Sequence, residues 1–427
     1  MGGLQEQLAI LRRKVARIDR KYAEAGRTPA VPIDNRPSRY FIEQWMSGEV
    51  VETPLGTHFE TEKLYERHRR HGSMDLSNLL ELPEDLLGAL SGNQAPPSPP
   101  SRWAFLDTET TGLAGGTGTY AFLVGVGRIC ADGFRVRQFF MRDYGEEPSL
   151  LWALARHLQE FDVLITYNGK TYDQPLLETR YHMARAQPPF GRLAHLDLLH
   201  GARRLWKLRL DSCRLVDLEN QILGVEREGD LPGEMIPYVY FEYLRTQQAF
   251  RVVPIFHHNA TDILSTACLT GIVPFAFREP GATLFAHGSD LVGLARWFLK
   301  AERRREALDL MRRAVKLGLP DDLLFRTLWD AAALEKKLEN EPAALQIWAE
   351  LAAGRNPYRV PALQALAKYY EHRARNYALA LDMIRGARAL ADSEDLARRQ
   401  ARIERLLAKS RAPSNGRSRD NLPMLAE

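Results

Sequence analysis

Apolar and polar residues in the middle of the chain alternate over short runs, which is the pattern of β-strands. The expected elements are strands at 103–106, 120–127, 134–141 and 163–167, a turn at 131–133, and a helix at 150–161. Strands that alternate with helices after an opening hairpin are typical of an α/β domain with a mixed sheet. We expect this domain to span residues 103–280.

The C-terminal third has a different pattern, without strand signals and rich in Ala, Leu and Arg. Three similar segments begin at Ala307, Ala344 and Ala380, at spacings of 37 and 36 residues. These spacings are close to the period of helix-pair repeats of the tetratricopeptide type. The pattern therefore predicts an all-α helical-repeat domain at 287–410, followed by a flexible tail at 411–427.

The region before the α/β domain is less regular. Apolar residues at spacings of three and four over 4–24 predict an amphipathic helix, whose basic face we interpret as a solvated surface in preference to a phosphate contact. A short alternating stretch lies at 50–53 and a helix-like stretch at 76–90. The Pro/Ser-rich residues 93–102 predict a linker, which would make residues 1–92 an N-terminal extension.

Composition excludes several classes of protein. With 45% hydrophobic and 26% charged residues, the chain can bury real cores and is not expected to be disordered. Its net charge of +4 excludes a polycation, so any affinity for nucleic acid must come from local patches. Three scattered cysteines give no zinc motif, and the apolar segment 263–277 is short for a membrane span. No signal peptide is seen, and we expect a soluble cytoplasmic protein without membrane contact.

Candidate chemistry begins with carboxylates in the α/β domain. Asp107 and Glu109 end the first predicted strand, where side chains at i and i+2 share a face. Asp173 lies where residues 167–175 leave a strand and enter a helix. Taken alone, each has a structural explanation, and Asp173 would suit a helix N-cap.

A third candidate position is the run His257-His258-Asn259-Ala260-Thr261-Asp262. His258 and Asp262 are at i and i+4 of a predicted helix, so they share a face and could also simply pair there. Asp197, after another apolar run, is a weaker candidate that could cap the helix that follows it. The Gly-rich residues 112–119 lack the spacing of a nucleotide-binding loop, and either a turn that admits a nucleic-acid strand or a plain hairpin connection would explain them.

Clustered carboxylates repel one another unless a cation neutralises them. Hard divalent ions such as Mg²⁺ prefer oxygen ligands. Four carboxylates can hold two such ions about 4 Å apart on either side of a scissile phosphate, and a nearby histidine can accept the proton of the attacking water. The combination therefore favours phosphodiester hydrolysis.

In chain order, these motifs resemble the DEDD superfamily of 3′-5′ exonucleases, whose fold is ribonuclease-H-like. The stretches LDTETTGLAGGTGTYAFLVGVG, YNGKTYDQPLLETR and HHNATDILS are similar to the YprB-type ribonuclease-H-like proteins. So are the segments Leu218–Gly224 and Asp230–Gly233, and the resemblance covers about 175 residues. It implies an α/β ribonuclease-H-like mixed-sheet domain followed here by the all-α repeats.

The resemblance also implies roles for individual residues. Asp107, Glu109, Asp173 and Asp262 would be the catalytic carboxylates that bind two Mg²⁺ or Mn²⁺ ions. The general base would be His258, which directly precedes the asparagine, with His257 as the alternative.

Substrate contacts are expected from Asn168, Lys170 and Thr108, although packing would explain Asn168 equally well. The leading hypothesis is a metal-dependent nuclease acting on DNA or RNA, a 3′-5′ exonuclease by a two-metal-ion mechanism. The alternative is a nucleic-acid-binding or protein-scaffolding factor with a weak or vestigial nuclease site. In either case the helical repeats could bind a protein partner.

Overall fold

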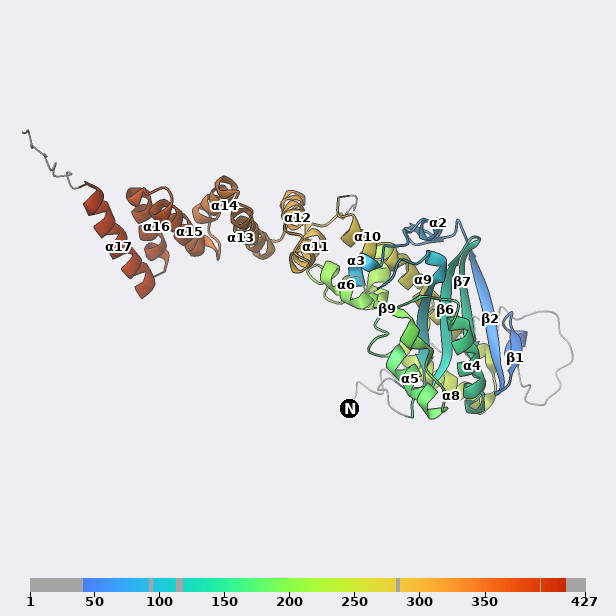
Figure 1. Cartoon of the computed structure of the whole chain (residues 1–427). Coiled ribbons are helices and arrows are strands. Elements are labelled where there is room, and N and C mark those ends of the chain that lie inside the picture. Colours follow the sequence, from blue (N-terminus) through green and yellow to red (C-terminus); the bar gives the residue numbers. More distant parts are fainter. Residues whose placement is uncertain (1–40, 92–94, 113–117, 282–284, 392, 412–427) are drawn as a thin grey trace, which may run out of the picture. The chain divides into compact units, whose positions relative to one another are not determined.

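The computed structural model describes residues 41–91, 95–112, 118–281, 285–391 and 393–411. The chain divides into two compact units, Met1–Thr283 and Leu284–Glu427. The first is a mixed sheet with helices, and the second consists of helices (Figure 1). The predicted N-terminal helix, most of the Gly-rich loop and nearly all of the tail lie outside the described residues.

A seven-stranded sheet forms the centre of the first unit, in the order β1-β2-β7-β6-β5-β8-β9. Strands β5, β8 and β9 are parallel and the other neighbours are antiparallel, so the predicted mixed sheet and fold class are confirmed. The strands are β1 (Glu49–Thr53), β2 (Gly56–Glu66), β5 (Trp103–Thr110), β6 (Ala121–Cys130), β7 (Gly133–Phe140), β8 (Val163–Thr166) and β9 (Ala194–Asp197). A separate two-stranded sheet comprises β3 (Arg70–His71) and β4 (Met74–Asp75).

The region predicted as an N-terminal extension contributes two strands to this sheet. Strand β2 pairs with β7 along its length, from Phe59 opposite Phe140 to Glu66 opposite Gly133. The Pro/Ser-rich stretch is also packed: the Trp103 indole donates to the Ser98 carbonyl at 3.0 Å. In the described residues this stretch is thus a connection inside one unit and does not separate two domains.

The helix-like stretch 76–90 is not one helix. Two short helices, α2 (Ser77–Leu80) and α3 (Gly88–Ser91), lie at its two ends. Pro83 lies between them, and proline both lacks an N–H and disfavours helical backbone at the preceding residue. The apolar spacing alone therefore overestimated the length of this helix.

Helices cover both faces of the sheet. Neighbouring residues of β7 show this, because their side chains point to opposite faces. The Phe139 ring lies 5.7 Å from the ring of His157 in α4 (Glu147–Leu158), whereas Gln138 donates to Asn259 of α9 (Val253–Thr270) at 2.8 Å. On the α9 side a Cβ atom at Gly125 would collide with Asn259, so glycine is needed there for the close approach.

The segment Ala249–Arg278, which includes α9, is apolar and helical enough to match a membrane span by length and composition. However, 72% of its most apolar window is buried inside the fold. This burial is what a core helix of a folded domain shows. The other α- and π-helices in the described part of this unit are α5 (Asp173–Met183), α6 (Leu198–Trp206), α7 (Leu215–Leu218), the π-helical turn η5 (Glu219–Leu223), α8 (Ile236–Thr246) and α10 (Val273–Arg278).

The second unit is a series of packed helices joined by short connections. They are α11 (Gly288–Lys300), α12 (Arg304–Leu317), α13 (Asp321–Lys337), α14 (Glu341–Ala353), α15 (Arg359–His372), α16 (Tyr377–Leu390) and α17 (Glu394–Arg411). Ala307, Ala344 and Ala380 lie in α12, α14 and α16 and are all completely buried. The repeated segments therefore occupy equivalent positions in successive helix pairs; their membership of the tetratricopeptide class stays a prediction.

Candidate active site

Strand β5 presents the first two carboxylates on one face. Asp107 lies opposite Gly125 and Glu109 opposite Leu123, and both point toward the α9 side of the sheet. The fully buried Asn259 donates to the Asp107 carboxylate at 2.8 Å and to its carbonyl at 3.2 Å. Since the Asn259 oxygen accepts from Gln138, the amide is oriented to donate toward Asp107.

Glu109 is the carboxylate of the site that neighbouring polar groups compensate least. It is 8% exposed, and its buried Oε1 has no hydrogen-bond partner among the described residues. Burial, followed by the charges of Asp107 and Asp262, raises the pKa of Glu109 well above its usual range. Burial likewise raises the pKa of Asp107, with Asp262 and Asp173 adding to the effect. These shifts indicate carboxylates that lack a sufficient counter-charge.

Asp173 is the first residue of α5, while Tyr172 occupies the N-cap position without a capping hydrogen bond from its side chain. The Asp173 carboxylate accepts from the Thr108 hydroxyl at 2.5 Å, which ties α5 to strand β5. Burial raises the pKa of Asp173 to about 6. Thr108 is thus engaged in positioning Asp173.

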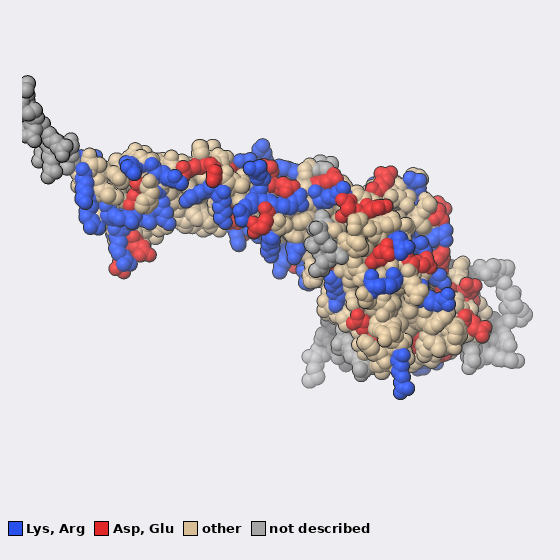
Figure 2. Space-filling view, viewed as in Figure 1, with Lys and Arg blue, Asp and Glu red and all other residues tan. Residues whose placement is uncertain are grey.

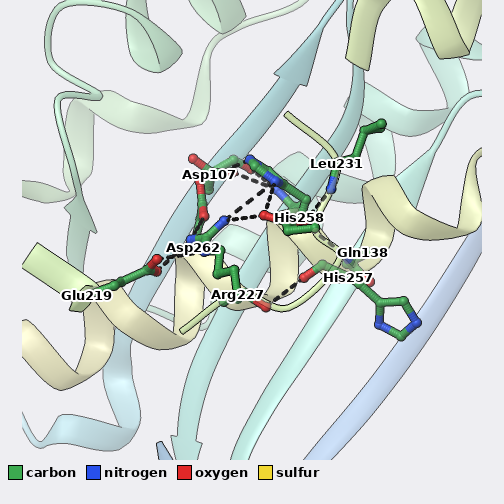
Figure 3. Close-up of polar contacts among 11 residues, drawn as sticks. Asp107, Gln138, Glu219, Arg227, Leu231, His257, His258 and Asp262 are labelled. Atoms are coloured by element: carbon green, nitrogen blue, oxygen red, sulfur yellow. Dashed lines mark hydrogen bonds and ion pairs between the residues drawn. The ribbon is translucent and has the colours of Figure 1, made fainter. Parts of the chain in front are cut away.

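Asp262 and His258 lie one turn apart on α9, beside an arginine that the sequence patterns did not single out (Figure 3). Asp262 forms an ion pair with Arg227, and the His258 Nε2 atom lies 3.8 Å from the second Asp262 oxygen. Arg227 also donates twice to Glu219, at 2.5 and 2.6 Å, and to Asp230 at 3.0 Å. A charged network therefore surrounds the Asp262 end of the site.

The two histidines differ clearly in position. The Nδ1 atom of His258 lies 2.8 Å from an Asp230 oxygen, and its side chain is only 15% exposed. Burial lowers the pKa of His258, but the hydrogen bond with Asp230 and the charges of Asp262 and Asp230 outweigh this effect and leave the pKa raised. His257 is exposed, and its ring points away from the network (Figure 3).

Asp197 makes its hydrogen bonds outside the carboxylate cluster, although its charge contributes to the raised pKa of Asp173. It is the N-cap of α6 and accepts from the backbone N–H of Leu199 at 3.0 Å. It also accepts from the backbone N–H groups of Asn168 at 2.8 Å and Lys170 at 3.1 Å. Asn168 has a φ of 69°, a left-handed conformation that asparagine tolerates better than most residues. Asp197 thus fixes the loop that carries Asn168 and the exposed Lys170.

The four carboxylates are not equally suited to bind a divalent cation. Among the described residues no three His, Cys, Asp or Glu side chains already form a group that could hold a metal ion. The unpartnered Glu109 oxygen suits a hard cation, since the charges of Asp107, Asp262 and Asp173 all act on this carboxyl. Asp262, in contrast, already has a cationic partner in Arg227. The first three carboxylates therefore fit an ion better than the fourth.

Sequence reasoning missed three residues of the charged network: Glu219, Arg227 and Asp230. Two of them lie in segments that contributed to the family resemblance, but nothing in the spacing indicates that one arginine joins both to Asp262. A lone arginine between acidic residues in an irregular stretch looks like an ordinary surface charge. Only the folded loop between η5 and α8 shows that the Arg227 side chain points toward these carboxylates.

Comparison with known proteins agrees with this geometry. Residues 104–273 match the RNase_H superfamily model RNase_H_2, which is the class of domain that the sheet and its carboxylates define. The chain is also 33% identical over 314 residues to the uncharacterized protein YprB of Bacillus subtilis (strain 168). That match covers 71% of this chain and 74% of YprB. The chain therefore belongs to the YprB-type family of ribonuclease-H-like proteins.

Proposed function

We propose that the chain is a divalent-metal-dependent nuclease that hydrolyses phosphodiester bonds of DNA or RNA as a 3′-5′ exonuclease. The observation that supports this most is the buried pair Asp107 and Glu109, with one Glu109 oxygen unpartnered among the described residues. Burying like charges side by side destabilises a fold unless a cation accompanies them. A metal-binding role explains why the site keeps them.

The cofactors that the family resemblance implies are two Mg²⁺ or Mn²⁺ ions, which would supply activation of a water and stabilisation of the leaving oxygen when bound. Asp107, Glu109 and Asp173 would hold one ion, and Asp262 is the fourth predicted ligand. His258 is the proposed general base, since it lies inside the network and His257 does not. Asp230 holds the Nδ1 side of the ring, which leaves Nε2 facing Asp262 to accept a proton.

A basic pocket beside the site suits the phosphate backbone of a substrate. It has a volume of about 660 Å³ and follows the carboxyl ends of β8 and β9, where open α/β sheets bind ligands. Asn168 lines it together with Arg203 of α6 and Lys207, the C-cap residue of that helix. Among the described residues these two cations have no ion-pair partner, so both are free to contact phosphates.

The helical unit is a proposed docking surface for a protein partner. Lys and Arg side chains are spread along it (Figure 2). Several of these arginines already serve the fold, such as Arg402, which pairs with the buried Glu371 at 2.7 Å. The remaining basic surface would suit an acidic partner or nucleic acid.

The proposal is tested by incubating the full chain with end-labelled single- and double-stranded DNA and RNA, with Mg²⁺, Mn²⁺ or a chelator. We expect metal-dependent shortening from the 3′ end, and no cleavage by Asp107→Ala. A circular substrate should resist an exonuclease. If no substrate is cleaved but nucleic acid is still bound, the chain is a binding factor with a vestigial site, and the enzyme proposal is overturned.

A further inference from the structure

The Arg227 side chain is fixed in the site by several partners. Its guanidinium is 11% exposed and donates in parallel to both oxygens of Glu219, at 2.5 and 2.6 Å. Glu219 is fully buried in η5, and Asp230 accepts a further hydrogen bond at 3.0 Å. Two further partners lie on α9: Asp262, which forms an ion pair with the guanidinium, and His258, whose Nδ1 atom lies 3.4 Å from it. Three separate segments of the chain thus fix one side chain.

This arrangement makes it costly for Arg227 to leave. A bidentate arginine–carboxylate pair needs both planar groups in one geometry, and Glu219 has no access to water that could replace its partner. Moving the guanidinium out would leave a buried, unpaired carboxylate. Arg227 is therefore a permanent part of the site and would remain when other cations bind.

Asp262 is consequently neutralised before any metal arrives. A divalent ion bound to Asp262 would lie close to the guanidinium, and two cations on one carboxylate repel each other. The other three predicted ligands are in a different situation. Glu109 has an oxygen without a partner among the described residues, and the partners of Asp107 and Asp173 are the neutral side chains of Asn259 and Thr108.

We infer that Arg227 permanently supplies the positive charge beside Asp262 that a second metal ion would otherwise supply, so that the site binds one divalent ion. That ion would bind to Asp107, Glu109 and Asp173, and the guanidinium would be the second positive charge facing the scissile phosphate. Arginine serves this purpose in other phosphate chemistry, where it stabilises the negative charge that develops in the transition state. The catalytic part of this inference rests on the proposed nuclease function, whereas the ion count does not.

The test is a direct count of Mn²⁺ bound to the full-length, metal-free chain, by calorimetric titration and by metal analysis after equilibrium dialysis. We expect one ion per chain in the wild type. Asp262→Asn should keep that ion, with an affinity loss below the roughly 10–100-fold typical of losing a ligand's hydrogen-bonding partner. Asp107→Asn should lose it. Two ions per wild-type chain, with one lost in Asp262→Asn, would overturn the inference.

A second variant asks whether Arg227 is what excludes the other ion. Arg227→Met combined with Glu219→Gln removes the guanidinium and its fully buried partner together, so that the half-buried Asp262 and Asp230 are the only carboxylates among its ion-pair partners that lose it. We expect this double variant to bind a second ion that depends on Asp262; if it folds and still binds one, Arg227 is not the cause. Should it fail to fold, the counts for the wild type and Asp262→Asn still decide.

The outcomes also separate this inference from the proposed function. Two bound ions with normal cleavage refute the single-ion inference alone. One bound ion without any cleavage refutes the nuclease proposal alone. No bound ion at all refutes both.

Discussion

Replacing Arg227 with methionine should destabilise the α/β unit in a pH-dependent way. Methionine has a similar length but no charge, so the principal loss is the partner of Glu219, which is fully buried. A buried carboxylate without a partner escapes the full cost of its charge by taking up a proton. The cost of protonation therefore limits the destabilisation.

The size of that limit follows from the ordinary pKa of a glutamate, 4.5. At pH 7 the carboxyl must be protonated about 2.5 pH units above this value, at about 1.36 kcal/mol per unit, which gives about 3.4 kcal/mol. At pH 5 the same argument gives about 0.7 kcal/mol. Burial already raises the pKa of Glu219 in the native protein, and loss of Arg227 would raise it further.

The direction of the pH dependence follows from the linkage between folding and proton binding. In the variant the folded state binds the Glu219 proton more tightly than the unfolded state does, so stability falls as pH rises above the unfolded pKa. Hydrogen exchange of β5 and β6 peptides at increasing urea concentrations would measure the free energy of unfolding of this unit alone. The loss relative to wild type should be several times larger at pH 7 than at pH 5.

The double variant Arg227→Met with Glu219→Gln provides the control, because it has no buried carboxylate at this place. Its stability relative to wild type should change little between the two pH values. The reasoning is refuted if the single variant loses the same free energy of unfolding at pH 7 and at pH 5. It is also refuted if the double variant shows the same pH dependence as the single variant, because the guanidinium would then not stabilise the fold through Glu219.

Three further predictions concern the chemistry and the substrate. His258→Gln should reduce the cleavage rate by about 10²-fold or more, the usual contribution of a general base, whereas His257→Gln should leave the rate unchanged. Reversing the charges of Arg203 and Lys207 should weaken binding of single-stranded nucleic acid and lower the slope of log affinity against log salt by about 1.4, or 0.7 per lost contact. Because burial raises the pKa of Asp173 to about 6, added Mg²⁺ should stabilise the protein more at pH 7.5 than at pH 5.5, as measured by thermal unfolding, since metal must displace protons at low pH.

Each of these has a control in the same chain. Arg67, exposed on the turn after β2 at the far end of the sheet, can be changed to glutamate to match one charge reversal away from the pocket. An equal loss of binding in that variant would contradict a role for the pocket. Equal rates for both histidine variants would remove the general base from His258, and equal stabilisation by Mg²⁺ at both pH values would place the ion elsewhere.

Much of the sheet could be predicted because its strands show simple alternation. The runs predicted at 134–141 and 163–167 correspond within a residue to β7 and β8. Strand β2 was missed because its four consecutive buried residues, His58 to Thr61, include three polar ones. The polar members are satisfied by partners far along the chain, as when Ser149 hydrogen-bonds His58 at 2.9 Å, and local sequence carries no sign of such partners.

The candidate site could likewise be predicted from the sequence only where its residues are close together in the chain. Asp107 and Glu109 could be placed together from strand geometry, and His258 and Asp262 from helix geometry, because each pair is local. That the charges of Asp173 and Asp262 act on Asp107 and Glu109 followed only from the family resemblance. The position of Arg227 could not be predicted, since it depends on how an irregular loop folds back onto α9.

The central claim is that the buried carboxylates are kept for metal-dependent cleavage at the expense of stability. Glu109→Gln tests it most directly, since it removes one repelling charge from a buried position and changes little in shape. The account predicts that this variant loses Mg²⁺- or Mn²⁺-dependent cleavage of end-labelled nucleic acid while its metal-free form unfolds at a higher temperature than wild type. Glu81→Gln, at an exposed carboxylate, should change neither. Wild-type cleavage by Glu109→Gln, or lost cleavage together with a lower unfolding temperature, would contradict the account.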